Sequence, residues 1–518
     1  MPVSHDLGFW SIAQADPHRL AVVDPQGRRT SFGELANLTN RYTHGLRALG
    51  LGAGDCVVTV LPNGLEQIAA MLAAYQGGIY VTPVNWHLSA SEIAYILADS
   101  DAGVLISHER FAAEAAGVLA GAGVPHAFSV GTIDGFRSIE ELTEGRPATR
   151  PEDLTTGSVM GYTSGTTGRP KGVRRPLNLR HPDESAVLAG FLLLLFGIQP
   201  HAGNVFLCAT PLYHSAGSLW TTMSLHLGHS VVLMDRWSPL ETLELIERHR
   251  ITHTHLVPTM FHRLLRLPTE DRDRYDVSSL RHVIHAAAPC PVETKQRMLD
   301  WWGDCIYEYY AATEGGGTLA TPADWRRFPG TVGKPWPETE VIVVDPEGHR
   351  LPPGESGTVY MKMPPSLRFE YHKDEHKTAD GRLGEFFTVG DVGYFNEEGY
   401  LFLNDRARDM IIVGGVNIYP AEIEGVMQQC PLVGDVAVFG VPDDDLGEKI
   451  KAVVEVVPGV EPGEATGRAV LGFLEGRLAK QRHPHTLDFS EALPRDPNGK
   501  LYKRRLRDPY WEGRTRRI

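Results

Sequence analysis

Two hydrophobic periods alternate from the N-terminus to about residue 400. Residues 56–61 are continuously apolar or β-branched, which is typical of a buried strand. Apolar side chains then recur at helical spacing over residues 65–75, and the glycines at 77–78 mark the end of that predicted helix. Ser89 and Glu92 have the spacing of a capping box, which predicts the start of the next helix. This alternation predicts an α/β fold, with a large N-terminal domain of mostly parallel sheets flanked by helices.

The pattern changes near residue 405. Beyond it, apolar residues follow a helical period over 423–427, and the segments 436–439 and 450–456 predict strands. Together they predict a small α+β domain at residues 405–518 after a large domain at residues 1–404. A chain of 518 residues also exceeds what one hydrophobic core usually serves, which favours two domains.

The longest apolar run, residues 186–198, is shorter than the ~20 residues that span a bilayer. We therefore expect no transmembrane segment here, but a buried helix, with the wall of an acyl pocket as the alternative interpretation. The N-terminus lacks the basic and apolar regions of a signal peptide, and the chain ends without a Ser-Lys-Leu address.

Charge and cysteine usage exclude several classes of partner. Fifty basic and 64 acidic side chains give a net charge of -14, which argues against a nucleic-acid or anionic-membrane partner. The five cysteines are Cys56, Cys208, Cys290, Cys305 and Cys430. Their odd number and scattered positions favour a reduced, cytoplasmic protein without a zinc site. The oligomeric state is not determined by the sequence, and a homodimer is compatible with it.

The most informative segment is 162–171, Tyr-Thr-Ser-Gly-Thr-Thr-Gly-Arg-Pro-Lys. Glycines let backbone N–H groups approach an anion, while hydroxyls and an ammonium add donors, so the segment predicts a polyphosphate cradle. It differs from the nucleotide loop of kinases and GTPases, because Arg-Pro follows its second glycine. A polar hairpin is the alternative. The candidate ligands are Thr163, Ser164, Gly165, Thr166, Thr167, Gly168 and Lys171.

Four later segments complete a pattern. They are 310–314 (Tyr-Ala-Ala-Thr-Glu), 388–391 (Thr-Val-Gly-Asp), 405–409 (Asp-Arg-Ala-Arg-Asp) and 494–500 (Pro-Arg-Asp-Pro-Asn-Gly-Lys). In type and order, the five segments resemble the motifs of the AMP-forming adenylating superfamily, which contains acyl-CoA synthetases, luciferases and peptide-synthetase adenylation domains. The resemblance covers nearly the whole chain. It implies that ATP, with Mg²⁺, activates a carboxylic acid as an acyl-adenylate, and that coenzyme A then receives the acyl group.

The resemblance also implies roles at the nucleotide. The 163–171 loop would hold the β- and γ-phosphates, and the hydroxyl of Thr313 would contact the α-phosphate. Glu314, together with Thr163, would hold Mg²⁺, because carboxylate and hydroxyl oxygens suit that ion. Taken alone, Glu314 is equally interpretable as a helix-capping acid.

Further implied roles concern adenine and ribose. Tyr310 would stack on adenine, opposite a face formed by Ala287, Ala288 and Pro289. Asp391 would accept both ribose hydroxyls, and Arg406 would pair with the nucleotide from the domain junction. The alternatives are a core aromatic for Tyr310, a turn aspartate for Asp391 and a surface ion pair for Arg406.

The resemblance also implies that the small domain moves. Lys500 would bridge the carboxylate and the α-phosphate, since a flexible ammonium donates three hydrogen bonds. Arg408 matches the hinge, and residues 414–417 would receive the pantetheine arm in a second arrangement of the domain. A plain turn is the alternative for 414–417. The basic cluster Lys503, Arg504, Arg505 and Arg507 is interpreted as a solvated face, with contact to CoA phosphate as the alternative.

The acid itself is the least determined feature. His214 matches an aromatic or histidine gate of acyl-CoA synthetases, with a core histidine as the alternative. No acid follows nearby to hold an amino acid's ammonium, so a fatty, aromatic or alicyclic acid is expected. The chain departs from the family at Arg174-Arg175. It also has alanines at positions 286, 287 and 311, and a tyrosine at position 309. These departures predict a crowded acyl site that disfavours very long chains. Two other hypotheses stay open: a stand-alone enzyme that loads a carrier protein, and a binding protein without activity.

Overall fold

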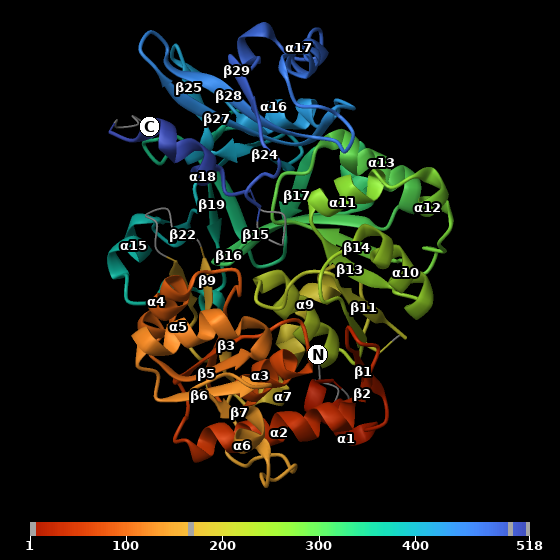
Figure 1. Cartoon of the computed structure of the whole chain (residues 1–518), viewed down its shortest axis with the longest axis vertical. Coiled ribbons are helices and arrows are strands. Elements are labelled where there is room, and N and C mark those ends of the chain that lie inside the picture. Colours follow the sequence, from red (N-terminus) through yellow and green to blue (C-terminus); the bar gives the residue numbers. More distant parts are fainter. Residues whose placement is uncertain (1–6, 164–169, 202, 496–500, 514–518) are drawn as a thin grey trace.

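The computed structural model describes residues 7–163, 170–201, 203–495 and 501–513. Its C-terminal part forms a separate lobe above the larger N-terminal part in Figure 1. The helices of the large domain include α1 (Phe9–Ala15), α2 (Phe32–Ala48), α5 (Ala112–Ala122), α6 (Ile139–Thr143), α10 (Pro239–His249), α12 (Thr269–Asp273), α13 (Val292–Trp302), α14 (Pro322–Arg327) and α15 (Glu375–Asp380).

A six-stranded, wholly parallel sheet organises the first part of the chain. Its order is β7 (Arg137–Ser138), β6 (His126–Val130), β5 (Ala102–His108), β3 (Cys56–Val60), β4 (Tyr80–Pro83) and β8 (Ser158–Val159). The predicted helix at 65–75 is α3 (Leu65–Gln76), which ends at Gly77. The predicted capping box opens α4 (Ala90–Asp99), where the Ser89 hydroxyl accepts from Glu92 N.

A longer mixed sheet joins the centre of the molecule to the base of the small lobe. Its parallel strands are β1 (Leu20–Val23), β12 (Ser230–Leu233), β11 (Val205–Cys208), β13 (His253–Leu256), β14 (His282–His285) and β15 (Ile306–Ala312). Antiparallel pairing begins at β15, because the two-residue turn Thr313-Glu314 is too short for a crossover. The antiparallel strands are β2 (Arg29–Ser31), β16 (Gly315–Ala320), β17 (Thr331–Pro335), β24 (Leu401–Arg406), β23 (Asp391–Phe395), β19 (Gly357–Lys362), β18 (Glu340–Val344), β22 (Phe386–Phe387) and β21 (Arg382–Leu383).

The expected single helix at 186–198 is wrong. The segment forms α7 (Pro182–Ala189) and α8 (Phe191–Leu195), which are separated at Gly190. A Cβ at Gly190 would lie 2.6 Å from Leu227 Cδ2, so glycine makes room there for the side chain of Leu227, which follows α9 (Ser215–His226). The helix α8 is also only partly buried, since Phe191 is 47% exposed.

The C-terminal lobe has its own five-stranded sheet. The strands are β26 (Val416–Ile418), β25 (Ile411–Val413), β28 (Gly447–Val456), β27 (Val433–Asp443) and β29 (Thr486–Phe489), with helices α16 (Pro420–Met427), α17 (Glu464–Phe473) and α18 (Lys503–Arg507). The chain leaves the large sheet at Arg406 and enters this sheet at Ile411. We propose that the boundary between domains 1–404 and 405–518 lies at this change of sheet.

None of the helices in the described ranges combines the length and the apolar character that crossing a membrane requires.

Candidate active site

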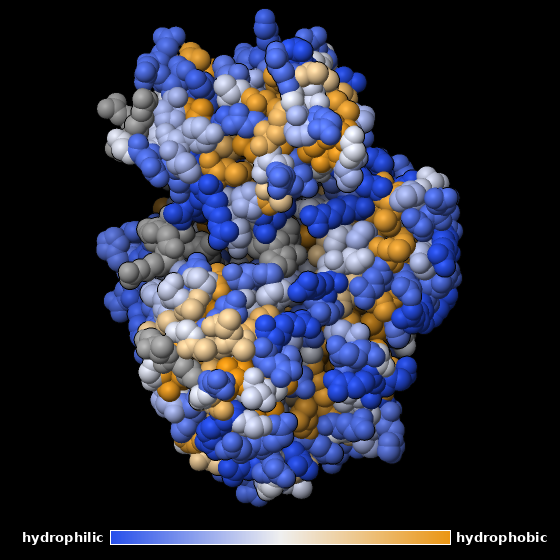
Figure 2. Space-filling view, viewed as in Figure 1, coloured by the Kyte–Doolittle hydropathy of each residue, from blue (hydrophilic) through white to orange (hydrophobic). Residues whose placement is uncertain are grey.

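One large cavity, of about 2230 Å³, is lined by both parts of the chain. Figure 2 shows a hollow between the upper lobe and the rest of the molecule, with hydrophilic residues along its rims. Thr163 and His214 line the cavity from the large domain, and Arg495, Leu501 and Tyr502 line it from the small one. Ser164, Gly165, Thr166, Thr167, Gly168 and Lys500 lie outside the described residues.

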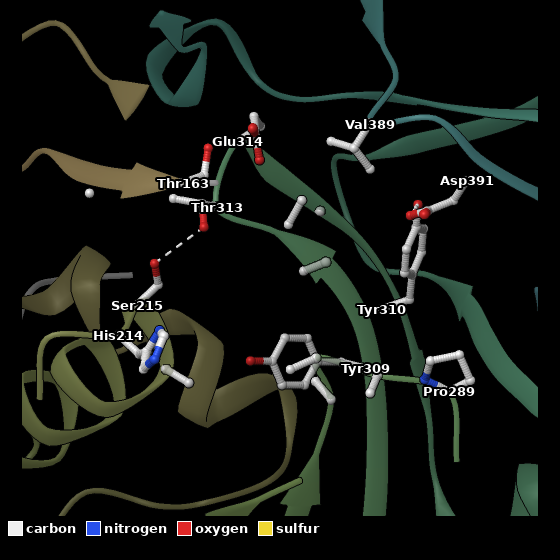
Figure 3. Close-up of a pocket in the computed structure, with 18 of the residues that line it drawn as sticks. Thr163, His214, Ser215, Pro289, Tyr309, Tyr310, Thr313, Glu314, Val389 and Asp391 are labelled. Carbon is white, nitrogen blue, oxygen red and sulfur yellow. Dashed lines mark hydrogen bonds between the residues drawn. The ribbon is translucent and has the colours of Figure 1, made fainter. Parts of the chain in front are cut away.

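Tyr310, Asp391 and Arg406 form one connected group, although they are far apart in the sequence. The hydroxyl of Tyr310 on β15 donates to Asp391 Oδ2 at 2.6 Å, as the facing side chains in Figure 3 show. Arg406 Nε lies 3.3 Å from Asp391 Oδ1, because Asp391 on β23 pairs with Arg406 on β24. Burial disfavours the charged guanidinium, but Asp391 and Asp409 outweigh it and raise the pKa of Arg406. The group therefore holds a carboxylate in a fixed orientation at the cavity.

The segment after β14 forms the wall beside Tyr310. Ala287, Ala288 and Pro289 all line the cavity. Ala287 has φ +76°, a conformation that residues with a Cβ rarely adopt and glycine adopts easily. The site therefore contains an alanine whose backbone conformation is strained.

Thr163 and Lys171 lie opposite each other. Thr163 ends β9 (Gly161–Thr163) and Lys171 begins β10 (Lys171–Arg174), and the two residues pair in an antiparallel sheet with β20 (Glu370–Tyr371). Burial and the nearby Lys377 lower the pKa of Lys171. The ammonium of Lys171 lies 5.1 Å from the ring centroid of Tyr371.

The Thr313-Glu314 turn is held from three sides. Glu314 is 7% exposed, and its Oε1 accepts a hydrogen bond from the Tyr371 hydroxyl at 2.9 Å. Arg175 Nη2 donates to Thr313 O at 2.6 Å. Thr313 Oγ1 lies 3.4 Å from Ser215 Oγ, the dashed line in Figure 3. Arg175, which the sequence marked as a departure from the family, therefore fixes this turn.

His214 lies immediately before α9 and lines the cavity. Its ring centroid is 4.6 Å from that of Tyr213. In Figure 3 the Tyr309 hydroxyl points toward the side that carries His214 and Ser215. That hydroxyl lies 3.2 Å from His255 Nε2.

The part of the cavity that α3, α8 and α9 line is called the apolar extension below. Its described lining comes from α3, α8 and α9: Met71, Leu72, Tyr75, Phe191, Leu192, Leu195, Ser215, Ala216, Ser218, Leu219, Thr222, Met223 and His226. It follows the whole of α9, which is 12 residues and hence about 18 Å long. The alternative interpretation of 186–198 as a pocket wall agrees with the place of α8.

Arg408 lies in the short helix η3 (Ala407–Asp409) that connects the two sheets. Its carbonyl accepts from Arg507 Nη1 at 3.4 Å. Burial and the adjacent Arg406 lower its pKa. Residues 414–417 form the tip of the β25–β26 hairpin, and the described part of the cavity lining includes none of them.

Sequence reasoning missed two buried ion pairs. Lys503 Nζ lies 2.8 Å from Glu424 Oε1, and its side chain is 13% exposed. The Arg507 side chain is also 13% exposed and lies 3.5 Å from Asp409 Oδ1, so the interpretation of a solvated face is wrong for Lys503 and Arg507. Lys295 Nζ lies 2.6 Å from Oε2 of Glu308, a residue of the cavity lining. Each pair joins side chains from two different elements, so the periodicity of a single helix or strand could not have identified it.

Comparison with known proteins agrees with this geometry. Residues 9–368 match the family model of the AMP-binding enzymes, and residues 422–500 match that of the AMP-binding enzyme C-terminal domain. The fatty acid–[acyl-carrier-protein] ligase ScoC of Streptomyces coeruleorubidus is 31% identical, over 98% of this chain and 96% of that protein. A feruloyl-CoA synthase of an Amycolatopsis species is 32% identical, over 97% of this chain and 98% of that protein.

Among solved structures, ATP-bound MatB from Rhodopseudomonas palustris superposes with a TM-score of 0.80. It is 30% identical, and the match covers 96% of each chain. The fold, the two matched domains and the full-length relatives all agree. The chain therefore belongs to the AMP-binding enzyme family and is an acid–thiol ligase.

Proposed function

We propose that this enzyme activates a hydrophobic carboxylic acid with ATP as an acyl-adenylate and then transfers the acyl group to coenzyme A. Pyrophosphate leaves in the first step and AMP in the second. The observation that carries the proposal is one cavity that joins the Tyr310–Asp391–Arg406 group, the Thr313-Glu314 turn and an apolar extension along α9.

The nucleotide would bind at the polar end of the cavity. The bond from the Tyr310 hydroxyl to Asp391 fixes this side chain, and its ring would stack on adenine opposite Ala287, Ala288 and Pro289. Asp391 would accept the ribose hydroxyls. Arg406 pairs with that carboxylate and adds a positive charge beside the nucleotide.

Phosphates and Mg²⁺ would bind at the Thr313-Glu314 turn. Tyr371 donates to Oε1 of Glu314, and Oε2 would hold a hard cation. The Thr163 hydroxyl lies at the same end of the cavity. Mg²⁺, when bound there, would neutralise phosphate charge as pyrophosphate leaves. Thr313 would donate to the α-phosphate, and Lys171 would hold the outer phosphates together with the adjoining loop.

Lys500 would supply the positive charge between the attacking carboxylate and the α-phosphate. Support comes from its sequence motif and from the lining of the cavity by Arg495 and Leu501, the described residues on either side of that segment. A preorganised ammonium at that point stabilises the charge that develops in the transition state.

The acid would enter past His214 into the apolar extension. None of the described lining residues from α3, α8 and α9 is acidic. The ammonium of an amino acid would be buried unpaired there, which costs several kcal/mol, whereas each buried CH₂ gains roughly 0.8 kcal/mol. A fatty, aromatic or alicyclic acid is therefore favoured. Its chain length stays a prediction.

A carrier protein is the alternative acceptor. The relative ScoC is named a fatty acid–[acyl-carrier-protein] ligase, and it matches nearly the whole chain. A pantetheine thiol is common to both acceptors, so the cavity supports either one.

A substrate panel tests the function. Pyrophosphate release should be fastest with medium-length, aromatic or ring-bearing acids, and slower with acetate and with each free amino acid. The same panel with coenzyme A, and then with a pantetheinylated carrier protein instead, distinguishes the acceptors. An amino acid or acetate with the highest kcat/KM would contradict the apolar assignment, and no pyrophosphate release at all would contradict adenylation.

A further inference from the structure

The small domain contacts the large one through two side chains at the end of α11 (Pro258–Leu265). Arg266, directly after α11, donates from Nη1 to Gly434 O at 3.1 Å and from Nη2 to Val433 O. His262, one turn earlier, places Nε2 3.3 Å from the same Gly434 O. In Figure 1, α11 lies on the side of the large domain that faces the upper lobe. We call these two residues, with Val433 and Gly434, the α11 clasp.

The strand β27 presents these carbonyls because its pairing is irregular there. Its register with β28 shifts between Val433 and Asp435, so Gly434 is the extra residue of a β-bulge. A bulged residue lies outside the ladder, which leaves its carbonyl for another donor. A Cβ at Gly434 would lie 2.9 Å from Glu455 O and Val456 O, so glycine is required at this close approach. The clasp therefore recognises one particular backbone feature of the small domain.

The clasp is connected to the cavity through the next residue. The carboxylate of Asp435 accepts from Arg495 Nε at 2.5 Å and from Arg495 Nη2 at 2.7 Å. Both side chains are largely buried, at 14% and 15% exposure, so this pair is well fixed. The backbone of Arg495 in turn pairs with that of Leu501 in an isolated antiparallel β-bridge, and both residues line the cavity. A large-domain helix thus holds the part of the small domain that reaches the cavity.

The electrostatics suit a switchable contact. Burial lowers the pKa of Arg266, while the charge of Asp435 acts in the opposite direction. Burial and the neighbouring Arg266 lower the pKa of His262 to about 4, so a neutral imidazole faces Gly434 O at pH 7. The Arg266 guanidinium binds two neutral carbonyl oxygens, and this polar contact buries little apolar surface. Rotation of the small domain can therefore break it.

We propose that His262 and Arg266 are positioning residues that hold the small domain in the arrangement that forms the acyl-adenylate. This rests on the proposed two-step function. In this arrangement Arg495 and Leu501 line the cavity, whereas the 414–417 hairpin contributes no described lining residue. A rotation of the small domain that brings this hairpin to the cavity would move the β27 bulge away from α11. The clasp therefore favours the first half-reaction and is absent from the second.

Two half-reactions measured separately test the proposal. Arg266→Ala should lower ATP–pyrophosphate exchange by ~10- to 100-fold, the range for losing hydrogen bonds from a charged donor. Formation of thioester from a synthetic acyl-adenylate and coenzyme A should stay at the wild-type rate. Arg266→Lys should recover part of the exchange, because an ammonium can reach one of the two carbonyls. Arg274→Ala, which removes an exposed arginine of the same domain, is the matched control and should change neither rate.

Several outcomes would overturn the clasp. Equal losses in both half-reactions, with a lowered Tm, would mean that Arg266 only stabilises the fold, and unchanged exchange would mean that the contact has no role. His262→Ala provides a second variant if Arg266→Ala does not fold, with the same split expected between the half-reactions. A wild-type protein that gives neither half-reaction would contradict the proposed function rather than the clasp alone.

Discussion

Replacing Lys295 with methionine should destabilise the large domain by roughly 3–5 kcal/mol. Its ammonium lies 2.6 Å from Glu308 Oε2 and 5.1 Å from the Trp325 ring centroid, and its side chain is 0% exposed. His285 Nε2 lies 3.3 Å from the same oxygen, and burial lowers the pKa of His285, so it is a weak substitute for Lys295. Removal of the ammonium therefore leaves a buried carboxylate without a cationic partner.

The pKa of Glu308 gives a second measure of the same interaction. Burial alone would raise it, but the Lys295 ammonium and His285 together outweigh burial and lower the pKa of Glu308 from 4.5 to about 2. Such a shift corresponds to roughly 3 kcal/mol, which agrees with the cost of breaking a buried pair. Because the folded pKa is depressed, this stability is present above pH 4.5 and is lost as the pH falls toward 2.

Urea unfolding followed by tryptophan fluorescence measures this effect. The difference between wild type and Lys295→Met should be full at pH 7 and should shrink below pH 4.5. The double variant Lys295→Met/Glu308→Leu is the control and should recover most of the loss, since apolar residues replace a buried pair at little cost. A loss below ~1 kcal/mol at pH 7, the value of a surface pair, would refute the reasoning.

Three further variants test the proposed site. Lys500→Ala should lose at least ~10²-fold in adenylate formation and still convert a synthetic acyl-adenylate to thioester, so wild-type pyrophosphate release would contradict its role. Arg408→Pro fixes φ near roughly -65°, so adenylate should form while thioester formation stalls, and an equal fall in both steps would exclude Arg408 as the pivot. Tyr309→Ala should raise the kcat/KM of longer acids relative to shorter ones, by up to about four-fold per added CH₂, if Tyr309 crowds the pocket. An unchanged ratio would show that Tyr309 does not limit chain length.

The sequence by itself determined the local elements and the chemistry. The strand at Cys56–Val60, the helix after it and the Ser89 capping box all follow from side chains within a few residues of each other. Likewise, the hydroxyl- and glycine-rich segment at 162–171 and the later motifs identify the family, because a phosphate site needs those residue types at that spacing.

Only the tertiary structure decided how distant residues meet. Tyr310 and Asp391 are 81 residues apart, and their hydrogen bond depends on strand pairing across the large sheet. Lys503 follows the pattern of a solvated basic cluster, yet its pairing with Glu424 buries it. Gly190 makes room for the Leu227 side chain, and Gly434 lies in a bulge that approaches the backbone of Glu455 and Val456. Periodicity is a property of neighbouring residues, whereas the burial of a charge and the strain at a turn depend on partners that folding brings from far along the sequence.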